Sequence, residues 1–159
     1  MEKIYTSNLA IRKFEICDAG AYFTNNHDAQ IKKFMPDHWH VDTNKAREEI
    51  QSFISCYQDM KMPYHFAITK DDILIGHIGI GESDIGKGNF EICYAINKNY
   101  RGLGYAKEAI CAFVPWCKTT FGIDKLYASI NKENTASYKS LLNAGFTLID
   151  ESNNLYVSS

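Results

Sequence analysis

The segment NKNYRGLGYAKEAICAF, residues 97–113, joins a turn with two glycines to the start of an apolar helical pattern. Apolar side chains recur after the turn at helical spacing, at Ala106, Ala109, Ile110, Phe113, Val114 and Cys117. The first turn of a helix carries N–H groups without intrahelical partners, and the helix dipole adds positive potential there. The segment is therefore a simple connecting turn, a nucleotide phosphate cradle, or a site for another anionic cofactor.

The two familiar nucleotide motifs fit this turn poorly. A dinucleotide fingerprint requires glycine where Lys107 stands and an acidic residue where the next strand ends at Asn131. A Walker A loop requires Gly-Lys-Ser/Thr, which the segment lacks. Gly102 and Gly104 still let an anion approach the backbone, and Arg101 offers a planar cation for phosphate oxygens.

Length and composition indicate one globular domain spanning residues 1–159. The net charge of −2 argues against nucleic acid as the main partner, because a phosphate footprint needs a basic face. No apolar run reaches the roughly 18 residues of a membrane span, and the N-terminus lacks the apolar centre of a signal peptide. The five cysteines include no C-x-x-C pair, which favours reduced thiols in a cytoplasmic protein. We expect Cys111 and Cys117 to pack in the core.

The remaining chain alternates between strand and helix patterns. Strands are expected at residues 8–14, on both sides of a turn at 70–72, and at 90–96, 125–130, 145–150 and 155–157. Helices are expected from Asp18 to about residue 24, at 28–34, after Asp42 or Thr43, after the glycine turn, and at 135–143. This order predicts an α/β (α+β) domain with a mixed sheet rather than a doubly wound one.

Three segments together resemble the GNAT superfamily of acetyl-CoA-dependent N-acetyltransferases. RGLGYA, residues 101–106, matches the family pattern Arg/Gln-x-x-Gly-x-Gly/Ala. YASINKENTASYKSLLNAGF, residues 127–146, is similar to the second signature, and FEICYAINKNY, residues 90–100, to the central strand. The N-terminal part resembles the branch of ribosomal-protein N-terminal acetyltransferases. The resemblance implies a twisted mixed sheet with splayed central strands and helices on both faces.

The resemblance also implies how acetyl-CoA is bound. Its pyrophosphate is expected on the turn formed by Arg101, Gly102, Leu103, Gly104, Tyr105 and Ala106. Its pantetheine arm is expected beside Tyr94, Ala95 and Ile96, and Asn131 and Asn134 match cofactor contacts of the family. From the residues alone, Asn131 is equally a turn residue and Asn134 equally a helix cap.

For catalysis we expect an amine to attack acetyl-CoA directly in a ternary complex, because no cysteine occupies a family motif position. Glu91 is the candidate general base, since burial on the central strand would strengthen it as a proton acceptor; a solvent-facing glutamate is the alternative. Many members carry a tyrosine acid where this chain has Leu141, so Ser137, Tyr138 or water are the candidate proton donors, although spacing favours a core role for Tyr138.

The acceptor is a protein N-terminus or a small-molecule amine, which Glu82 or Asp84 are expected to hold by charge. By resemblance, DHWH at residues 37–40 borders the acceptor pocket, with Asp37 as an anchor and Trp39 as an apolar wall. Its two histidines lack a third ligand nearby in the sequence, so we expect no metal. The oligomeric state, monomer or homodimer, stays open. The alternatives are a coenzyme-A-binding module without turnover and a nucleotide-phosphate-binding domain.

Overall fold

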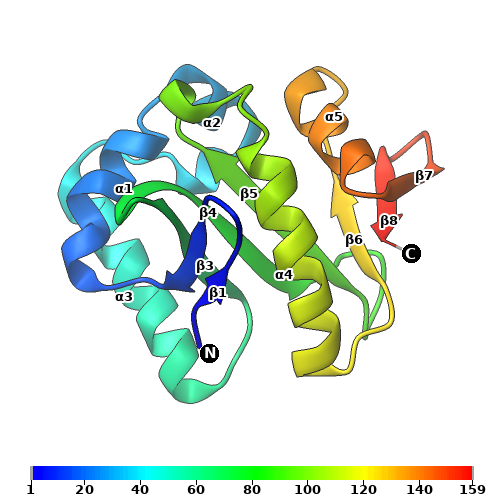
Figure 1. Ribbon diagram of the computed structural model, residues 1–159, viewed down its shortest axis with the longest axis horizontal. Coiled ribbons are helices and arrows are strands. Elements are labelled where there is room, and N and C mark those ends of the chain that lie inside the picture. The colour runs from blue at the N-terminus through cyan, green and yellow to red at the C-terminus, as the bar shows by residue number, and fades with distance from the viewer. Residues whose placement is uncertain (1, 159) are drawn as a thin grey trace.

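The computed structural model describes residues 2–158 and contains one mixed eight-stranded sheet (Figure 1). The strands are β1 Ile4–Tyr5, β2 Ala10–Lys13, β3 Tyr64–Lys70, β4 Ile73–Glu82, β5 Phe90–Ile96, β6 Leu126–Ser129, β7 Phe146–Asp150 and β8 Leu155–Ser158. Their order in the sheet is β1-β2-β3-β4-β5-β6-β8-β7. Within the described chain, β5 with β6 is the one parallel pair, so the α/β (α+β) expectation is confirmed.

Helices cover both faces of this sheet. They are α1 Ala19–Asn26, α2 Ala29–Phe34, α3 Thr43–Asp59, α4 Tyr105–Phe121 and α5 Thr135–Asn143, with short 3-10 turns η1 Ile16–Asp18, η2 Pro36–His38 and η3 Lys98–Tyr100. Strand alternation sends Phe66 and Ile68 to a core shared with α4, and Ala67 to a second core shared with α1 and α3. Figure 1 shows α1 and α3 side by side and apart from α4.

The two central strands separate, as expected for a splayed sheet. β5 pairs with β4 along its whole length, from Phe90 opposite Glu82 to Ile96 opposite Gly76. Among the described residues, its parallel register with β6 includes only Phe90 opposite Leu126 and Glu91 opposite Tyr127. Figure 1 shows the strands diverging toward the end that α2 and α5 flank. The backbone edge of β5 from Ile92 to Ile96 is thereby left without a strand partner in residues 2–158.

Three local expectations require correction. Asp18 precedes α1, but its side chain caps no N–H group of that helix. Its carboxylate instead accepts from Arg12 at 2.7 and 2.8 Å and from the Glu15 N–H group, before η1, at 2.8 Å. Cys117 is buried, whereas Cys111 is exposed, because position 111 falls beside the apolar stripe of α4 rather than within it. Tyr138 is 42% exposed and packs against the ring of Tyr156, because Leu141 is the buried residue of α5 and the turn before it stays at the surface.

Candidate active site

The glycine turn opens a cavity of about 480 Å³ between α2, β5, α4 and α5. Gly104, with φ of 85°, is the N-cap of α4, and Gly102 has φ of 77°. Both values lie in the left-handed region that glycine adopts without a steric penalty. An added Cβ would meet nothing within 4 Å at either position, so the space above the turn is open. Unpaired N–H groups of the first turn of α4 therefore border an accessible cavity that suits an anion.

The guanidinium of Arg101 is held by the protein rather than left free for a ligand. Its Nη2 lies 2.6 Å from Asp28 Oδ2, its Nη1 donates to Gln30 at 2.8 Å, and its Nε donates to the Ile96 carbonyl at 2.7 Å. The first two bonds tie α2 to the glycine turn. This arrangement differs from the expectation that the side chain is available for phosphate oxygens, although Arg101 still lines the cavity.

The other residues expected at the cofactor divide into two groups. Tyr94, Ala95, Ile96, Tyr105, Ala106 and Asn134 line the first cavity with the two glycines. Leu103 is 61% exposed and lies outside the lining, and Asn131 lines a neighbouring cavity. Asn134 also caps α5, because its Oδ1 accepts from the Ser137 N–H at 3.2 Å. Both interpretations of Asn134 are thus compatible with its position.

A second cavity of about 390 Å³ lies where β5 and β6 begin to separate. Glu82, Glu91, Asn131 and Ser137 are part of its lining. The carboxylate of Glu91 accepts from Ser129 N–H at 2.7 Å and from the Ser83 hydroxyl at 2.9 Å. The Glu91 carboxylate therefore binds the Ser129 N–H group, which lies just beyond the last β5–β6 pair. The Glu91 side chain is partly buried.

Ser137 and Tyr94 line both cavities, which also share Phe34, Met35 and Asn134. The Tyr94 hydroxyl donates to the Ser137 carbonyl at 3.0 Å. Burial raises the pKa of Tyr94 to about 12, against the smaller opposing effect of that hydrogen bond. The phenol is thus neutral at physiological pH. Leu141, which stands at the position of the tyrosine acid that the family resemblance implies, is fully buried in the main core.

The structure does not bring Asp37 and Trp39 to the lining of either cavity. Asp37 is exposed on η2, while the Trp39 ring stacks on His27 at 5.1 Å and lies under Lys32 Nζ at 4.3 Å. Their neighbour His38 points into the second cavity instead. Asp84 is exposed and also lies outside both linings.

Comparison with known proteins decides the family. Residues 8–147 match the acetyltransferase (GNAT) domain family. The chain belongs to this family. This GNAT protein is also 30% identical to the N-acetyltransferase p20 of Bacillus licheniformis over 92% of this chain and 83% of that protein. It is therefore an N-acetyltransferase, and members of this family use acetyl-CoA.

Solved structures agree with this assignment at the level of the fold. A GNAT acetyltransferase of Bacillus anthracis superposes with a TM-score of 0.79 at 24% identity, over 98% of this chain and 95% of that one. The ribosomal-protein acetyltransferase RimL, solved with coenzyme A, superposes with a TM-score of 0.81 at 16% identity, over 98% and 97%. In the described part of this GNAT protein, no helix is both long and apolar enough to cross a membrane.

Sequence reasoning missed two residues of the second cavity, His65 and Cys93, and considered His38 only as part of DHWH, without a third ligand nearby in the sequence. The three residues come from η2, β3 and β5; Cys93 lies in the segment similar to the central strand of the family, but no site role is expected for it there. His65 and Cys93 occupy one row of the sheet, since each pairs with Gly79 on β4. The alternation of side chains along β3 and β5 shows which face each residue occupies. It does not show that His65 and Cys93 are neighbours until the register of β3, β4 and β5 is known.

Proposed function

We propose that this GNAT protein transfers the acetyl group of acetyl-CoA to a primary amine by direct attack in a ternary complex. The observation that carries the proposal is the meeting of the two cavities at Tyr94 and Ser137. One cavity begins at a helix N-terminus whose N–H groups suit an anion, and the other contains carboxylates. A donor and an acceptor entering from opposite ends would meet beside β5.

The first cavity is the proposed site of acetyl-CoA. Its pyrophosphate would accept hydrogen bonds from N–H groups of the turn and the first turn of α4, from Gly102 to Ala106. The pantetheine arm would lie along Tyr94, Ala95 and Ile96, whose backbone edge has no strand partner among residues 2–158. An extended amide chain at this edge would satisfy groups that β6 leaves unpaired.

The second cavity is the proposed site of the amine. The amine must lose a proton before it attacks, and Glu91 is the proposed acceptor of that proton, directly or through water. Glu82 is exposed at the same cavity and adds negative charge that would attract an ammonium group. Ser137 is the proposed donor of a proton to the departing thiolate, because it lines both cavities.

A protein N-terminus or a small-molecule amine is the proposed acceptor. Two solved neighbours are named as acetyltransferases of ribosomal proteins, which supports a protein N-terminus. The acidic lining of the second cavity suits either class, because both present a compact cationic amine.

Steady-state kinetics test this proposal. Thiol release from acetyl-CoA should be measured against peptides with free and with blocked N-termini, and against amino acids and polyamines. Direct transfer predicts intersecting lines when both substrates are varied, and no acetylated protein when the amine is omitted. Parallel lines together with an acetylated cysteine would contradict direct attack. Tight coenzyme A binding without turnover on any amine would instead favour a binding module.

A further inference from the structure

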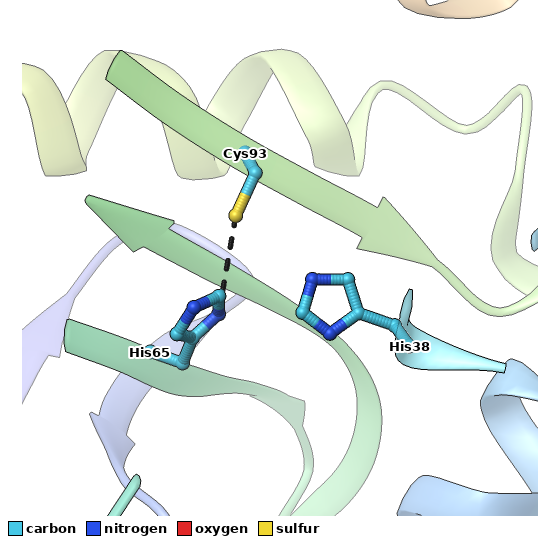
Figure 2. Close-up of side chains that lie close together, drawn as sticks. All are labelled: His38, His65 and Cys93. Atoms are coloured by element: carbon cyan, nitrogen blue, oxygen red, sulfur yellow. Dashed lines mark hydrogen bonds between the residues drawn. The ribbon is translucent and has the colours of Figure 1, made fainter. Parts of the chain in front are cut away.

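Three side chains with metal-binding atoms converge in the second cavity. His38, His65 and Cys93 point toward a common space from η2, β3 and β5 (Figure 2). One donor atom from each lies within 4.8 Å of the other two. Cys93 Sγ lies 3.9 Å from His65 Nδ1. The residues are separated by 27 or more positions in the sequence, so the tertiary fold alone brings them together.

Strand β4 lies between His65 and Cys93, and its residue at that point, Gly79, has no side chain to separate them. His65 on β3 and Cys93 on β5 both pair with Gly79 on β4, so the three residues form one row across the sheet. A Cβ at Gly79 would lie 2.7 Å from His65 Nδ1, which is closer than real contacts allow. Glycine at position 79 therefore provides the space through which the imidazole reaches the thiol.

This donor set matches the ligand preferences of zinc. Thiolate sulfur and imidazole nitrogen are its usual protein ligands, and three protein ligands leave a fourth position open to water or another ligand. Zinc bonds of about 2.0–2.3 Å place tetrahedral ligand atoms roughly 3.3–3.6 Å apart, so a contraction of about 1 Å would complete the set. We propose that His38, His65 and Cys93 form a binding site for a divalent cation of the zinc class.

The outer contacts of His38 orient its ring for this role. His38 Nδ1 lies 2.7 Å from Glu49 Oε1 on α3, and the Tyr22 hydroxyl lies 3.2 Å from the same nitrogen. The other Glu49 oxygen lies 2.5 Å from His40 Nε2. With Nδ1 engaged, the remaining nitrogen of His38 faces the thiol (Figure 2). A carboxylate behind a ligating histidine is the usual outer partner in zinc sites.

A further histidine, His77, lies beside the cluster. His77, 5.0 Å from the His38 ring, is fully buried, and neither ring nitrogen has a partner in the described chain. Zinc binds the thiolate form of cysteine, so metal binding would release the proton of Cys93.

The proposed metal site shares the second cavity with the proposed amine site, but metal binding can be measured without acetyl transfer, so its test uses the metal alone. The purified chain, stripped with a chelator, should be titrated with Co²⁺ and then with Zn²⁺ in competition with a chromophoric chelator. The proposal predicts one equivalent bound, and a thiolate-to-cobalt charge-transfer band in the near ultraviolet that zinc abolishes. Absence of that band, or of stoichiometric zinc binding, would overturn it.

Variants assign the site. Cys93→Ser should remove the charge-transfer band, whereas Cys111→Ser, which alters an exposed thiol on α4, should retain it. Glu49→Gln should weaken zinc binding about 10–100-fold, as loss of an outer partner does. Gly79→Ala should displace His65 and weaken binding, whereas Gly20→Ala, where a Cβ meets nothing within 4 Å, should not. Circular dichroism would verify folding. A band that survives Cys93→Ser and Gly79→Ala in folded protein would refute the assignment.

Discussion

Arg101 Nη2 lies 2.6 Å from Asp28 Oδ2, and this ion pair joins the glycine turn to the first residue before α2. The Asp28 carboxylate also caps α2, because its Oδ1 accepts from the N–H groups of Gln30 and Ile31. Only 11% of the Asp28 side chain and 25% of the Arg101 side chain is exposed. One wall of the cofactor cavity is therefore fixed to the turn by a partly buried charged contact.

Replacing Asp28 tests this contact. Asp28→Asn keeps the cap, since asparagine caps helices as well as aspartate, but it removes the charge opposite Arg101. We expect a loss of about 1.5–3 kcal/mol in the free energy of unfolding and a higher KM for acetyl-CoA. Asp42→Asn is the matched control, because Asp42 caps α3 and is exposed. Equal unfolding free energies for both variants in urea would show that the ion pair contributes nothing.

The left-handed conformation of Gly104 has a predictable cost. Gly104→Ala and Gly122→Ala both place alanine at positive φ, 85° and 65°, with nothing within 4 Å of the new methyl group. Each should lower the free energy of unfolding by about 1–2 kcal/mol, measured by urea denaturation. A much larger loss in Gly104→Ala alone would mean that the turn is constrained by contacts rather than by its backbone angles.

Glu91 and Glu82 are expected to affect different kinetic constants. Glu91→Gln should lower kcat about 10²–10⁴-fold if the carboxylate accepts the amine proton. Glu82→Gln should mainly raise KM for the amine, because the residue is exposed at the cavity and attracts charge. Both are measured by thiol release with an established acceptor. If Glu91→Gln has the same kcat as the parent across the pH range, Glu91 is not the general base. Its role would then be structural, through the hydrogen bond that it accepts from the Ser129 N–H group.

Glu108 provides a pH-dependent contribution to stability. Burial raises the pKa of Glu108, but hydrogen bonds from Thr6 and Asn8 outweigh it and lower the pKa below 4.5. A lowered folded-state pKa stabilises the protein above pH 4.5, and this stabilisation is lost as pH falls through the folded value.

Glu108→Gln should therefore cost about 1–2 kcal/mol of unfolding free energy near pH 7 and much less near pH 3. Glu48→Gln, which removes an exposed pair with Lys45, should cost less than about 1 kcal/mol. Denaturant unfolding of both variants at several pH values measures this, and a cost of Glu108→Gln that does not change with pH would argue against the lowered pKa.

The sequence predicts the fold well because its signals are local. Apolar spacing locates α3 and α4, the turn at 70–72 separates β3 from β4, and the glycine turn opens α4 as expected. Errors arise where a side chain has two candidate partners. Asp18 bonds Arg12 across a turn rather than capping α1, and this choice depends on how β2 approaches η1.

The site is predicted less completely, because its parts lie on different strands. Gly102 and Gly104 are recognised since the motif is contiguous. The convergence of His65 with Cys93 depends on the pairing of both with Gly79, which no short window of sequence contains. Arg101 is likewise recognised as a cavity residue, but its pairing with Asp28 spans 73 positions and is visible only in the fold.

Coenzyme A binding to three forms of the protein tests the central claim most directly. Calorimetric titration should give one site in the parent chain, at least tenfold weaker binding (about 1.4 kcal/mol) in Gly104→Ala, and parent-like binding in Gly122→Ala. The two variants change the same type of backbone position, and only Gly104 borders the cavity. Equal affinities in both variants, or binding of ATP or NAD in place of coenzyme A, would contradict the account.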